Sequence, residues 1–534
     1  MGREMRWWGW GEEARAAGAP DAVLAWFAGE LGELDAPRGP VALEDVRIDP
    51  PRLPQAVRER FPDILRDDRA ARVLHARGKS YPALVRQRRG DCAGAPDAVL
   101  APRDHDEVRA VLEACASAGV AVVPFGGGTS VVGGLEAVRG DLDAAISLDL
   151  GGLDALERLD ERSQVAVVGG GMRAIELDAR LAERGFTLGH YPQSYEYVSI
   201  GGCVATRSAG QASTGYGRID DLVVGARLAA PAGDLELRAQ PASAAGPELR
   251  RMVIGSEGVL GPITRVAVCV RPAPELSRHE GFAFPSFGAG AEALRRLEQD
   301  GVAPDVARLS DEEETRMGIG LAGLGAARAT ALRAYLRARG VANGAVAIVG
   351  WSGGEDAVRT RREAAVEVLR AQGGVAIGQQ AGRAWVRTRF SAPYLRDDLM
   401  DRGVLADTLE TATTWAQLFA LYRAVGDALR EHARIVACHI SHLYPTGASL
   451  YFSFMTRVEP GEELARWAAA KRAASDAIVA AGGTITHHHA VGRDHAPYLG
   501  AEVGDTGLAA LRALKRELDP AGIMNPGKLL PPPD

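Results

Sequence analysis

The stretch Pro124-Phe-Gly-Gly-Gly-Thr-Ser-Val-Val-Gly-Gly134 decides the fold of this chain. It follows an apolar run at residues 120–123 that is typical of a buried strand. Three consecutive glycines leave no side chain between the backbone and a ligand, and the free N–H groups of such a loop form an anion-binding nest. Thr129 and Ser130 add hydroxyl donors. The stretch therefore indicates a loop that binds a phosphate or pyrophosphate, with a flexible glycine turn as the alternative.

The loop does not match the two commonest nucleotide-binding motifs. A Walker A loop ends in Gly-Lys-Ser/Thr, and no lysine is present here. A Rossmann fingerprint needs glycine at its sixth place, which is Val131 when the count starts at Gly126. A later stretch, Gly169-Gly-Gly-Met-Arg-Ala174, fits G-x-G-x-x-A, but no ribose-binding acid is evident after it. We therefore predict no dinucleotide-binding Rossmann site at that stretch.

Composition restricts the class of protein. The chain has 534 residues, of which 46% are apolar and 25% charged, as in globular proteins with two or more domains. A formal net charge of −7 gives no support for a nucleic-acid partner. The five cysteines are scattered without Cys-x-x-Cys spacing, which argues against a disulfide framework or a zinc cage and suits a reducing compartment.

The N-terminal region combines two features that bear on location. No apolar run reaches the length of a membrane span, and the first six residues lack an apolar signal core, so we expect a cytoplasmic protein. Trp7-Trp-Gly-Trp10 places three exposed-looking indoles close together. They either dock on the body of the protein or, since indole suits a water–lipid interface, make a peripheral membrane contact.

A regular alternation of strands and helices begins near Pro96. The helix expected after Asp104 has Val108, Val111 and Leu112 on one face, as an amphipathic helix requires. Such alternation predicts an α+β or α/β nucleotide-binding domain. The expected strands cover residues 95–100, 120–124, 145–150 and 164–168, and the expected helices cover 104–119 and 173–185.

Two further glycine-rich segments follow. Residues 190–225 are dense in Gly, Ser and Thr yet interleaved with apolar residues, and their glycines permit close approach to a flat or charged ligand. Gly255-Ser-Glu-Gly-Val-Leu-Gly-Pro-Ile-Thr264 is a second glycine loop, and it leads into an expected strand at 265–271.

These motifs, in this order and with the tail Leu518-Asp-Pro-Ala-Gly-Ile-Met-Asn-Pro-Gly-Lys528, resemble the FAD domain of the vanillyl-alcohol-oxidase superfamily. The resemblance implies an α+β fold with a two-subdomain FAD-binding domain, not a doubly wound sheet. It implies that the glycine loop holds the FAD pyrophosphate. Many relatives attach the flavin to a histidine in or near this loop, but Gly126–Ser130 contains none, so we expect noncovalent FAD. The positions that the resemblance assigns to FAD are Pro124, Gly126, Gly127, Gly128, Thr129, Ser130, Gln193, Ser194, Ser199, Gly201, Gly202, Thr206, Ser208, Gly210, Tyr216, Gly217, Glu257, Gly258 and Ile263.

The middle of the chain departs from the FAD pattern. Its strand-then-helix order predicts an antiparallel sheet backed by helices, which would form a cap over the flavin. The resulting domain prediction is an N-terminal helical segment (1–90), an FAD-binding domain (91–275), a cap or substrate domain (276–505) and a C-terminal segment that returns to the FAD domain (506–534). We also expect a homodimer.

Three groups of cap residues resemble the alkyldihydroxyacetonephosphate synthase (alkylglycerone-phosphate synthase) family. They are Ala307-Arg-Leu-Ser-Asp311, the region from Tyr394-Leu-Arg-Asp397 to Trp415, and Gly447-Ala-Ser-Leu-Tyr-Phe-Ser-Phe454 with the later His487-His-His489. The resemblance implies an enzyme of ether lipid synthesis, which exchanges the acyl group of acyl-dihydroxyacetone phosphate for a long-chain alcohol through a flavin adduct. It implies Tyr451, His487, His488 and His489 as catalytic residues and Arg308 and Arg396 as substrate-binding residues. One departure is His-Ala-Val-Gly-Arg493, where the family has His-Gly-Val-Gly-Lys.

Two alternatives stay open from the residues alone. The same FAD domain would serve an oxidase or dehydrogenase of a 2-hydroxy acid of the glycolate or D-lactate type. Adjacent histidines also suggest a metal site. On a strand, however, successive side chains alternate faces, so that only His487 and His489 would lie on the same face and could bind the same ion. No cysteine or well-spaced carboxylate completes a zinc set, and we therefore predict no metal.

Overall fold

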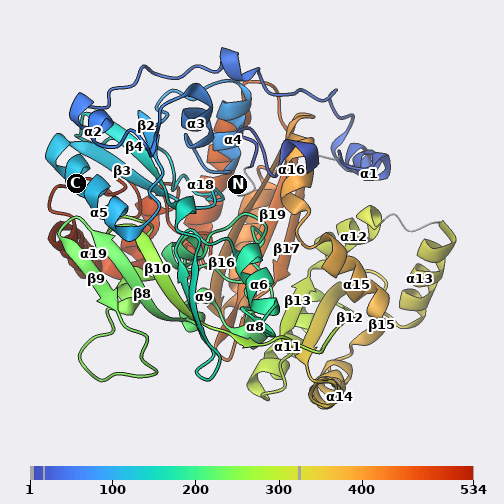
Figure 1. The fold of residues 1–534 in the computed structure, drawn as a ribbon. Coiled ribbons are helices and arrows are strands. Elements are labelled where there is room, and N and C mark those ends of the chain that lie inside the picture. The colour runs from blue at the N-terminus through green and yellow to red at the C-terminus, as the bar shows by residue number, and fades with distance from the viewer. Residues whose placement is uncertain (1–4, 16–17, 323–325, 533–534) are drawn as a thin grey trace.

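The computed structural model describes residues 5–15, 18–322 and 326–532 (Figure 1). Its strands form a four-stranded sheet (β1-β2-β4-β3), a five-stranded sheet (β5-β6-β10-β8-β9) and an eight-stranded sheet (β15-β12-β14-β13-β17-β19-β16, with β18 on β19). A two-stranded sheet pairs β11 (Arg271–Pro272) with β7 (Phe186–Thr187). Helices and mostly antiparallel sheets alternate without a doubly wound core. The predicted α+β class is confirmed.

The four-stranded sheet places the glycine loop. Strands β2 (Ala98–Leu100), β4 (Ala144–Asp149) and β3 (Val120–Phe125) are parallel neighbours, and β1 (Leu65–Arg66) pairs antiparallel with β2. Helix α5 (His105–Ala118) is capped by the Asp104 carboxylate and ends at Gly119, whose φ of 65° is the left-handed conformation that favours glycine. Strand β3 is buried along most of its length and ends at the glycine loop.

The five-stranded sheet explains the G-x-G-x-x-A stretch. Its strands are β5 (Leu156–Asp160), β6 (Val165–Gly169), β8 (Val223–Ala230), β9 (Gly233–Leu237) and β10 (Ile263–Cys269), and α6 (Ala174–Ala182) follows β6. A Cβ atom on Gly170 would lie 2.0 Å from the carbonyl oxygen of Ile263, and one on Gly171 would lie 1.8 Å from that of Leu150. These glycines are needed for backbone packing, which supports the prediction that the stretch is not a dinucleotide site.

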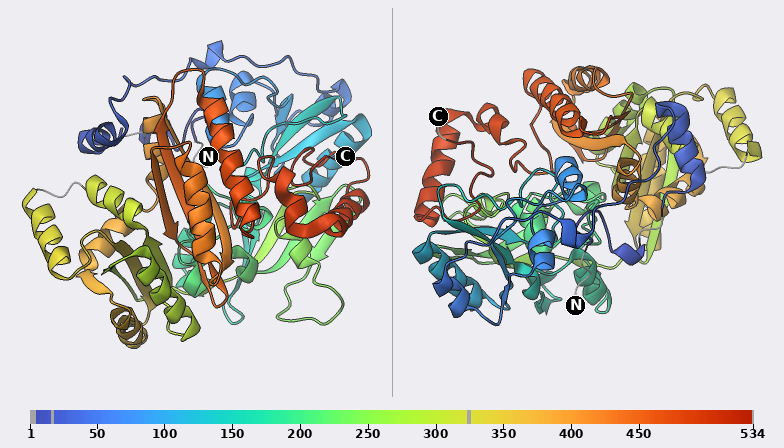
Figure 2. Two further views of the ribbon diagram at one scale, coloured as in Figure 1. Left: turned by 180° about the vertical axis from the view of Figure 1, so that it is seen from behind. Right: turned by 90° about the horizontal axis from the view of Figure 1, so that it is seen from above.

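The large antiparallel sheet occupies the second half of the chain, as predicted (Figure 1). Its core cluster is packed by helices α11, α14, α17 and α18, and Figure 2 (left) shows α17 and α18 against its strands. The sheet consists of β12 (Leu276–Phe284), β13 (Val306–Ser310), β14 (Ala345–Gly353), β15 (Val375–Gly378), β16 (Val404–Thr414), β17 (Ile435–Ile440), β18 (Leu443–Tyr444) and β19 (Gly447–Arg457). The helices of this part are α11 (Phe287–Gln299), α12 (Glu312–Leu321), α13 (Ala326–Ala338), α14 (Glu355–Ala371), α15 (Gln379–Thr388), α16 (Ala392–Met400), α17 (Leu418–Arg430) and α18 (Glu463–Ala480).

The segment after helix α19 (Leu499–Leu518) returns to the glycine-loop sheet. The helix is kinked at Gly504, where φ is 68°. Beyond it, the N–H of Val122 in β3 donates to the carbonyl of Ile523, and the N–H of Asn525 donates to the carbonyl of Val122, both at 2.8 Å. The end of the chain therefore extends the edge of the sheet that carries the glycine loop. The exact domain boundaries stay predictions.

The N-terminal indoles are packed rather than exposed. Trp10 is 3% exposed and meets Tyr197 edge-on, with ring centroids 5.8 Å apart. Trp7 and Trp8 are half-buried, and the Arg6 guanidinium lies 4.1 Å from the centre of the Trp8 ring. Of the two readings of these indoles, docking on the body of the protein is the one that the structure shows, because cation–π and apolar contacts hold them there. Among the described residues, the helices offer none that is both long and apolar enough to cross a bilayer.

Candidate active site

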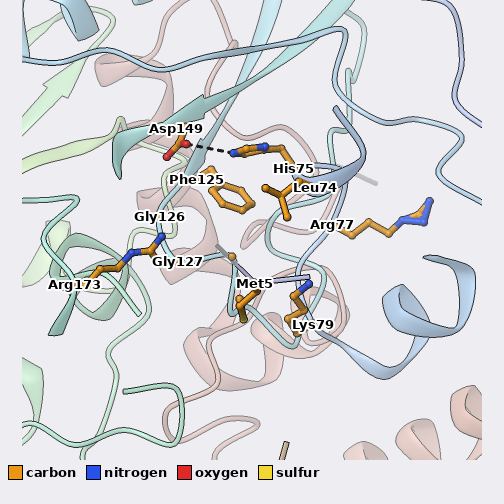
Figure 3. A pocket seen from close by; sticks show the side chains of 11 residues that line it. Met5, Leu74, His75, Arg77, Lys79, Phe125, Gly126, Gly127, Asp149 and Arg173 are labelled. Atoms are coloured by element: carbon orange, nitrogen blue, oxygen red, sulfur yellow. Dashed lines mark hydrogen bonds and ion pairs between the residues drawn. The ribbon is translucent and has the colours of Figure 1, made fainter. Parts of the chain in front are cut away.

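The glycine loop lines a small pocket together with Met5, Lys79, His75 and Arg173 (Figure 3). Within the described part of the chain, the backbone N–H groups of residues 126–130 donate no hydrogen bond to another protein group. A run of free backbone donors beside the basic side chains of Lys79, His75 and Arg173 fits a pyrophosphate. The residues present therefore suit the diphosphate of FAD.

The glycines of this loop are required by close contacts. A Cβ atom on Gly126 would lie 2.2 Å from Ser199 Oγ, and one on Gly127 would lie 2.2 Å from the carbonyl oxygen of Tyr197. Gly128 has a φ of 71°. The loop thus packs directly on the segment of Ser199, which caps the short helix α7 (Ile200–Ala205) by accepting from the Gly202 N–H at 3.2 Å. Two of the motifs assigned to FAD are in contact.

The other positions assigned to FAD have varied surroundings. The amide nitrogen of Gln193 is buried without a protein partner, which leaves a donor for a ligand. The remaining positions have roles inside the protein: Ser194 accepts from the N–H of Tyr197, Thr206 donates to the Gly202 carbonyl, Ser208 contacts His190, Gly210 packs on Tyr191, Tyr216 packs on Gly189, Gly217 has a φ of 89°, Gly201 packs on Gly170, Gly258 packs on Pro124, and Ile263 is in the core.

Glu257 connects the second glycine loop to the histidine segment. Its carboxylate accepts hydrogen bonds from the N–H groups of Val491 at 2.8 Å and Gly492 at 2.7 Å. Burial raises the pKa of Glu257 to about 7, against the effect of these two N–H groups. Asn525 of the returning C-terminal segment donates to the Glu257 carbonyl at 2.7 Å. The structure thus shows Glu257 holding backbone segments together.

Tyr451 lies on β19 in the middle of the large sheet. Its hydroxyl donates to Thr408 Oγ1 on the neighbouring strand β16 at 3.1 Å. Its ring stacks on His439 of β17, with centroids 4.8 Å apart and planes at 19°. Burial raises the pKa of Tyr451 to about 12, so the phenol is neutral at ordinary pH.

His439 is held by Arg308 and Glu314. Arg308 Nη1 donates to His439 Nε2 at 2.9 Å, so that nitrogen must be an acceptor and the proton lies on Nδ1. Nδ1 then donates to Glu314 Oε1 at 2.9 Å, and Arg308 Nη2 donates to the same oxygen at 2.8 Å. Burial alone would raise the pKa of Glu314, but Arg308 and His439 lower it to about 2. An ionised Arg308–Glu314 pair therefore fixes a neutral His439 against Tyr451.

The histidine triplet lies in a bend after α18, not on a strand. The buried carboxylate of Glu410 organises this bend: it accepts from the backbone N–H groups of His487, of His488 at 3.0 Å and of His489 at 2.8 Å. Burial alone would raise the pKa of Glu410, but the facing histidines hold it well below its ordinary value. The argument from strand alternation is wrong, because a carboxylate-centred bend can turn adjacent side chains toward one another.

His442 and Tyr444 join the triplet, although neither was predicted. Tyr444 OH lies 2.6 Å from His487 Nε2, and His487 Nδ1 lies 3.0 Å from His488 Nδ1. His442 Nδ1 lies 2.6 Å from the hydroxyl of Ser213, which belongs to the glycine-rich segment 190–225. Arg218 donates to the His487 carbonyl at 3.0 Å. We call Tyr451, His439, His442, His487, His488 and His489 the histidine–tyrosine cluster.

The histidines of this cluster are neutral bases. Burial lowers the pKa of His487, His488 and His489, in the case of His489 to about 3. His488 and His489 nevertheless expose 15% of their side chains, so their rings can meet a ligand. Neutral imidazole accepts a proton on one nitrogen while its other nitrogen is held, which is suited to proton transfer.

Arg396 lies on α16, in another group of residues. Its Nη1 donates to the carbonyl of Lys79 at 2.8 Å, while its Nε and Nη2 are buried without a hydrogen-bond partner, and Nη2 forms an ion pair with Asp397 at 3.6 Å. Burial lowers the pKa of Lys79 to about 7. In the described part of the chain no hydrogen bond or ion pair connects Arg396 to the histidine–tyrosine cluster, whereas Arg308 is part of its support.

Glu410 and His439 give only a weak signal in the sequence. Each is a polar residue within a stretch that reads as a buried strand, where an unpaired charge or imidazole is costly. That signal predicts a partner for each residue but not which partner.

Comparison with known proteins places the chain among flavoproteins. Residues 96–237 match the FAD binding domain family, and residues 273–529 match the family of FAD linked oxidases, C-terminal domain. The chain is 32% identical to the alkyldihydroxyacetonephosphate synthase of Dictyostelium discoideum, over 92% of this chain and 83% of that protein. It is 33% identical to that of Trypanosoma brucei brucei, over 88% of this chain and 79% of that protein.

Solved structures agree with these relatives. A structure of an alkyldihydroxyacetonephosphate synthase superposes with a TM-score of 0.85 at 28% identity, covering 98% of both chains. The p-cresol methylhydroxylase structure, at 14% identity and a TM-score of 0.69, covers 90% of this chain and 99% of that chain and shares the fold.

Proposed function

The chain belongs to the alkyldihydroxyacetonephosphate synthase family, and we propose that it exchanges the acyl group of acyl-dihydroxyacetone phosphate for a long-chain alcohol. The observation that carries the proposal is the histidine–tyrosine cluster, in which the neutral Tyr451 stacks on a histidine fixed by Arg308 and faces two partly exposed histidines.

The enzyme uses FAD, which supplies an electron sink when bound. We propose that the free N–H groups of residues 126–130 bind its diphosphate and that attachment is noncovalent, since this loop lacks a histidine. Acid precipitation should release all of the yellow colour to the supernatant. Flavin that stays with the precipitated chain would contradict noncovalent binding.

Proton transfer is the task that we assign to the cluster. At neutral pH the fatty acid leaves as a carboxylate while the alcohol loses its hydroxyl proton, so each turnover passes one proton out of the site. His488 is partly exposed and contacts His487, which in turn contacts Tyr444. We assign Tyr451 to proton movement at the substrate carbon, and His487, His488 and His489 to taking the proton of the alcohol.

We assign the two arginines to the anionic part of the substrate. Guanidinium binds phosphate through paired hydrogen bonds. Arg396 Nε and Nη2 are buried without a hydrogen-bond partner and can donate to the phosphate, although Nη2 already forms an ion pair with Asp397. Arg308 already contacts Glu314 and His439, so its contact with substrate would be coupled to the orientation of His439.

The test is to incubate the purified protein with palmitoyl-dihydroxyacetone phosphate and labelled hexadecanol. We expect labelled alkyl product, release of palmitate, and no turnover of an electron acceptor. A 2-hydroxy-acid dehydrogenase would instead bleach its flavin with glycolate or D-lactate and form no ether product. Flavin bleaching by a hydroxy acid without ether formation would overturn the proposal.

We further propose that the protein is a homodimer in the cytoplasm. We also propose that it contacts the periphery of a membrane, because both long-chain substrates partition into lipid. Light scattering after gel filtration tests the dimer, and flotation with liposomes tests the membrane contact. Since Trp7 and Trp8 pack on the body, the Trp7→Ala/Trp8→Ala variant should float as well as the parent protein. A parent protein that never floats would exclude the membrane contact.

A further inference from the structure

Three imidazoles of the histidine–tyrosine cluster lie close enough together to be ligands of one metal ion. We propose that His442, His487 and His488 bind a transition-metal dication such as Zn²⁺, and that its binding inhibits the enzyme. One ring nitrogen from each of the three residues lies within 4.8 Å of those of the other two. His442 belongs to the loop between β17 and β18, and the other two to the bend after α18, so the site joins two segments.

The distances are close to those of a metal centre. Zn–N bonds of about 2.0–2.1 Å at tetrahedral angles place two ligand nitrogens roughly 3.3 Å apart. The Nδ1 atoms of His487 and His488 are 3.0 Å apart, so one ion could bind both with little movement. The rings of His442 and His487 are stacked with centroids 4.9 Å apart, so His442 must rotate to present the third ligand nitrogen, which lies within 4.8 Å of the other two.

Two rings are already oriented through their other nitrogen, as metal-bound histidines usually are. Ser213 Oγ contacts Nδ1 of His442, which leaves its Nε2 for the ion. Tyr444 OH contacts Nε2 of His487, which leaves its Nδ1. Burial lowers the pKa of all three rings, and the neutral form is the one that binds a metal.

The charges around the site set its selectivity. Arg218, on the carbonyl of His487, opposes a cation, whereas the Glu410 carboxylate lies 3.7 Å from His488 Nδ1 and favours one. Three nitrogen ligands suit Zn²⁺, Cu²⁺ or Co²⁺ and not Mg²⁺ or Ca²⁺, which prefer oxygen. The site should therefore discriminate strongly between these two classes of cation.

Inhibition follows from the ligands that the ion takes. A bound ion would occupy the Nδ1 atoms of His487 and His488, which the proposed function uses for proton transfer. This part of the inference rests on the proposed function, whereas the binding itself does not.

Binding is measured first, by titrating the purified FAD-loaded protein with Zn²⁺ and with Co²⁺ in a calorimeter, with Mg²⁺ as the control cation. We expect one Zn²⁺ per chain and no Mg²⁺ signal. His442→Ala should lose this binding, whereas His432→Ala, which removes a histidine outside the cluster, should keep it. Ser213→Ala should weaken Zn²⁺ binding by about 10–100-fold, because it removes the partner that orients His442.

A variant that fails to fold is recognised by loss of its flavin spectrum. If His442→Ala fails to fold, Zn²⁺ binding by Ser213→Ala is the test of the site. Synthase activity of the parent protein should be lower with Zn²⁺ than in metal-free buffer. In Ser213→Ala, the Zn²⁺ concentration for half inhibition should rise by the same factor by which Zn²⁺ binding weakens. Zn²⁺ affinity that is the same in parent, His442→Ala and Ser213→Ala proteins would overturn the site. Specific Zn²⁺ binding with undiminished synthase activity would overturn inhibition. Absence of activity in metal-free buffer counts against the proposed function, not against the metal site.

Discussion

The glycine loop presents backbone N–H groups from one stretch of five residues, whereas the histidine–tyrosine cluster presents side chains from strands β17 and β19, a loop and a bend. The first site needs the absence of side chains, because a Cβ on Gly127 would meet the Tyr197 carbonyl. The second needs partners for each side chain, such as Glu410 for the triplet and Glu314 for His439. A cofactor site can thus be local in sequence while the site that acts on the substrate depends on long-range contacts.

The largest expected effect comes from Tyr451→Phe, which tests whether the cluster performs chemistry. The substitution removes the hydroxyl and its bond to Thr408 but keeps the ring that stacks on His439. We expect synthase turnover to fall by about 10²–10⁴-fold, the range for losing a general acid or base. The flavin content should not change. Tyr335→Phe, at an exposed position of helix α13, is the matched control, and equal activity in both variants would remove Tyr451 from the chemistry.

Gly127→Ala tests the opposite property, the need for a bare backbone. Its Cβ would lie 2.2 Å from the Tyr197 carbonyl oxygen, so the loop must shift. Overpacking of this kind costs about 1–3 kcal/mol, and we expect FAD affinity to weaken by a corresponding factor of roughly 5–150. FAD titration of the apoprotein measures it. Gly39→Ala, which has open space around its Cβ, is the control; unchanged FAD affinity in Gly127→Ala would show that the loop does not contact the cofactor.

Arg308→Ala and Arg396→Ala test whether both arginines bind the substrate, one beside the histidine–tyrosine cluster and one outside it. Each loss of a charged hydrogen bond should weaken apparent substrate affinity by roughly 1–3 kcal/mol. Arg308→Ala should also lower turnover, because His439 loses the donor that fixes its tautomer, whereas Arg396→Ala should act mainly on KM. Steady-state kinetics with varied acyl substrate separate the two. Unchanged KM in both variants would remove them from the substrate site.

Glu257→Gln gives the smallest effect and concerns the connection between the two regions. The folded-state pKa of Glu257, about 7, exceeds its ordinary value of 4.5, so the folded protein binds more protons between these values. The stability contributed by this group is therefore complete below about pH 4.5 and is lost as the pH rises toward 7. Denaturant unfolding of the parent protein and of Glu257→Gln at pH 5 and pH 8 measures this pH-dependent stability.

We expect Glu257→Gln to gain stability relative to the parent protein as the pH rises from 5 to 8. Gln can still accept one of the N–H groups of Val491 and Gly492, so the fold should survive. A difference between the two proteins that does not depend on pH would show that Glu257 is ionised in the folded state.

Much of the fold followed from the sequence because its signals are local. The strand before Pro124, the amphipathic helix after Asp104 and the strand at Ala144–Asp149 all have a periodicity or apolar run that neighbouring residues determine. Helices α15 and α16 were not predicted, and α16 begins with a proline at its first turn within a mixed polar stretch. Their positions depend on packing more than on propensity.

The residues of the candidate site likewise differ in whether local sequence or long-range packing determines them. The sequence alone determined the bare glycine loop and the presence of Tyr451, Arg308 and the histidine triplet, because a missing Cβ and a motif are properties of contiguous residues. Only the tertiary structure decided that the triplet bends around Glu410, that His439 stands between Arg308 and Tyr451, and that His442 turns toward His487. The residues of these pairs are between 12 (His439 and Tyr451) and 131 (Arg308 and His439) positions apart in the sequence. Buried polar groups must find hydrogen bonds wherever the packed chain offers them, and residue spacing in the sequence does not specify that choice.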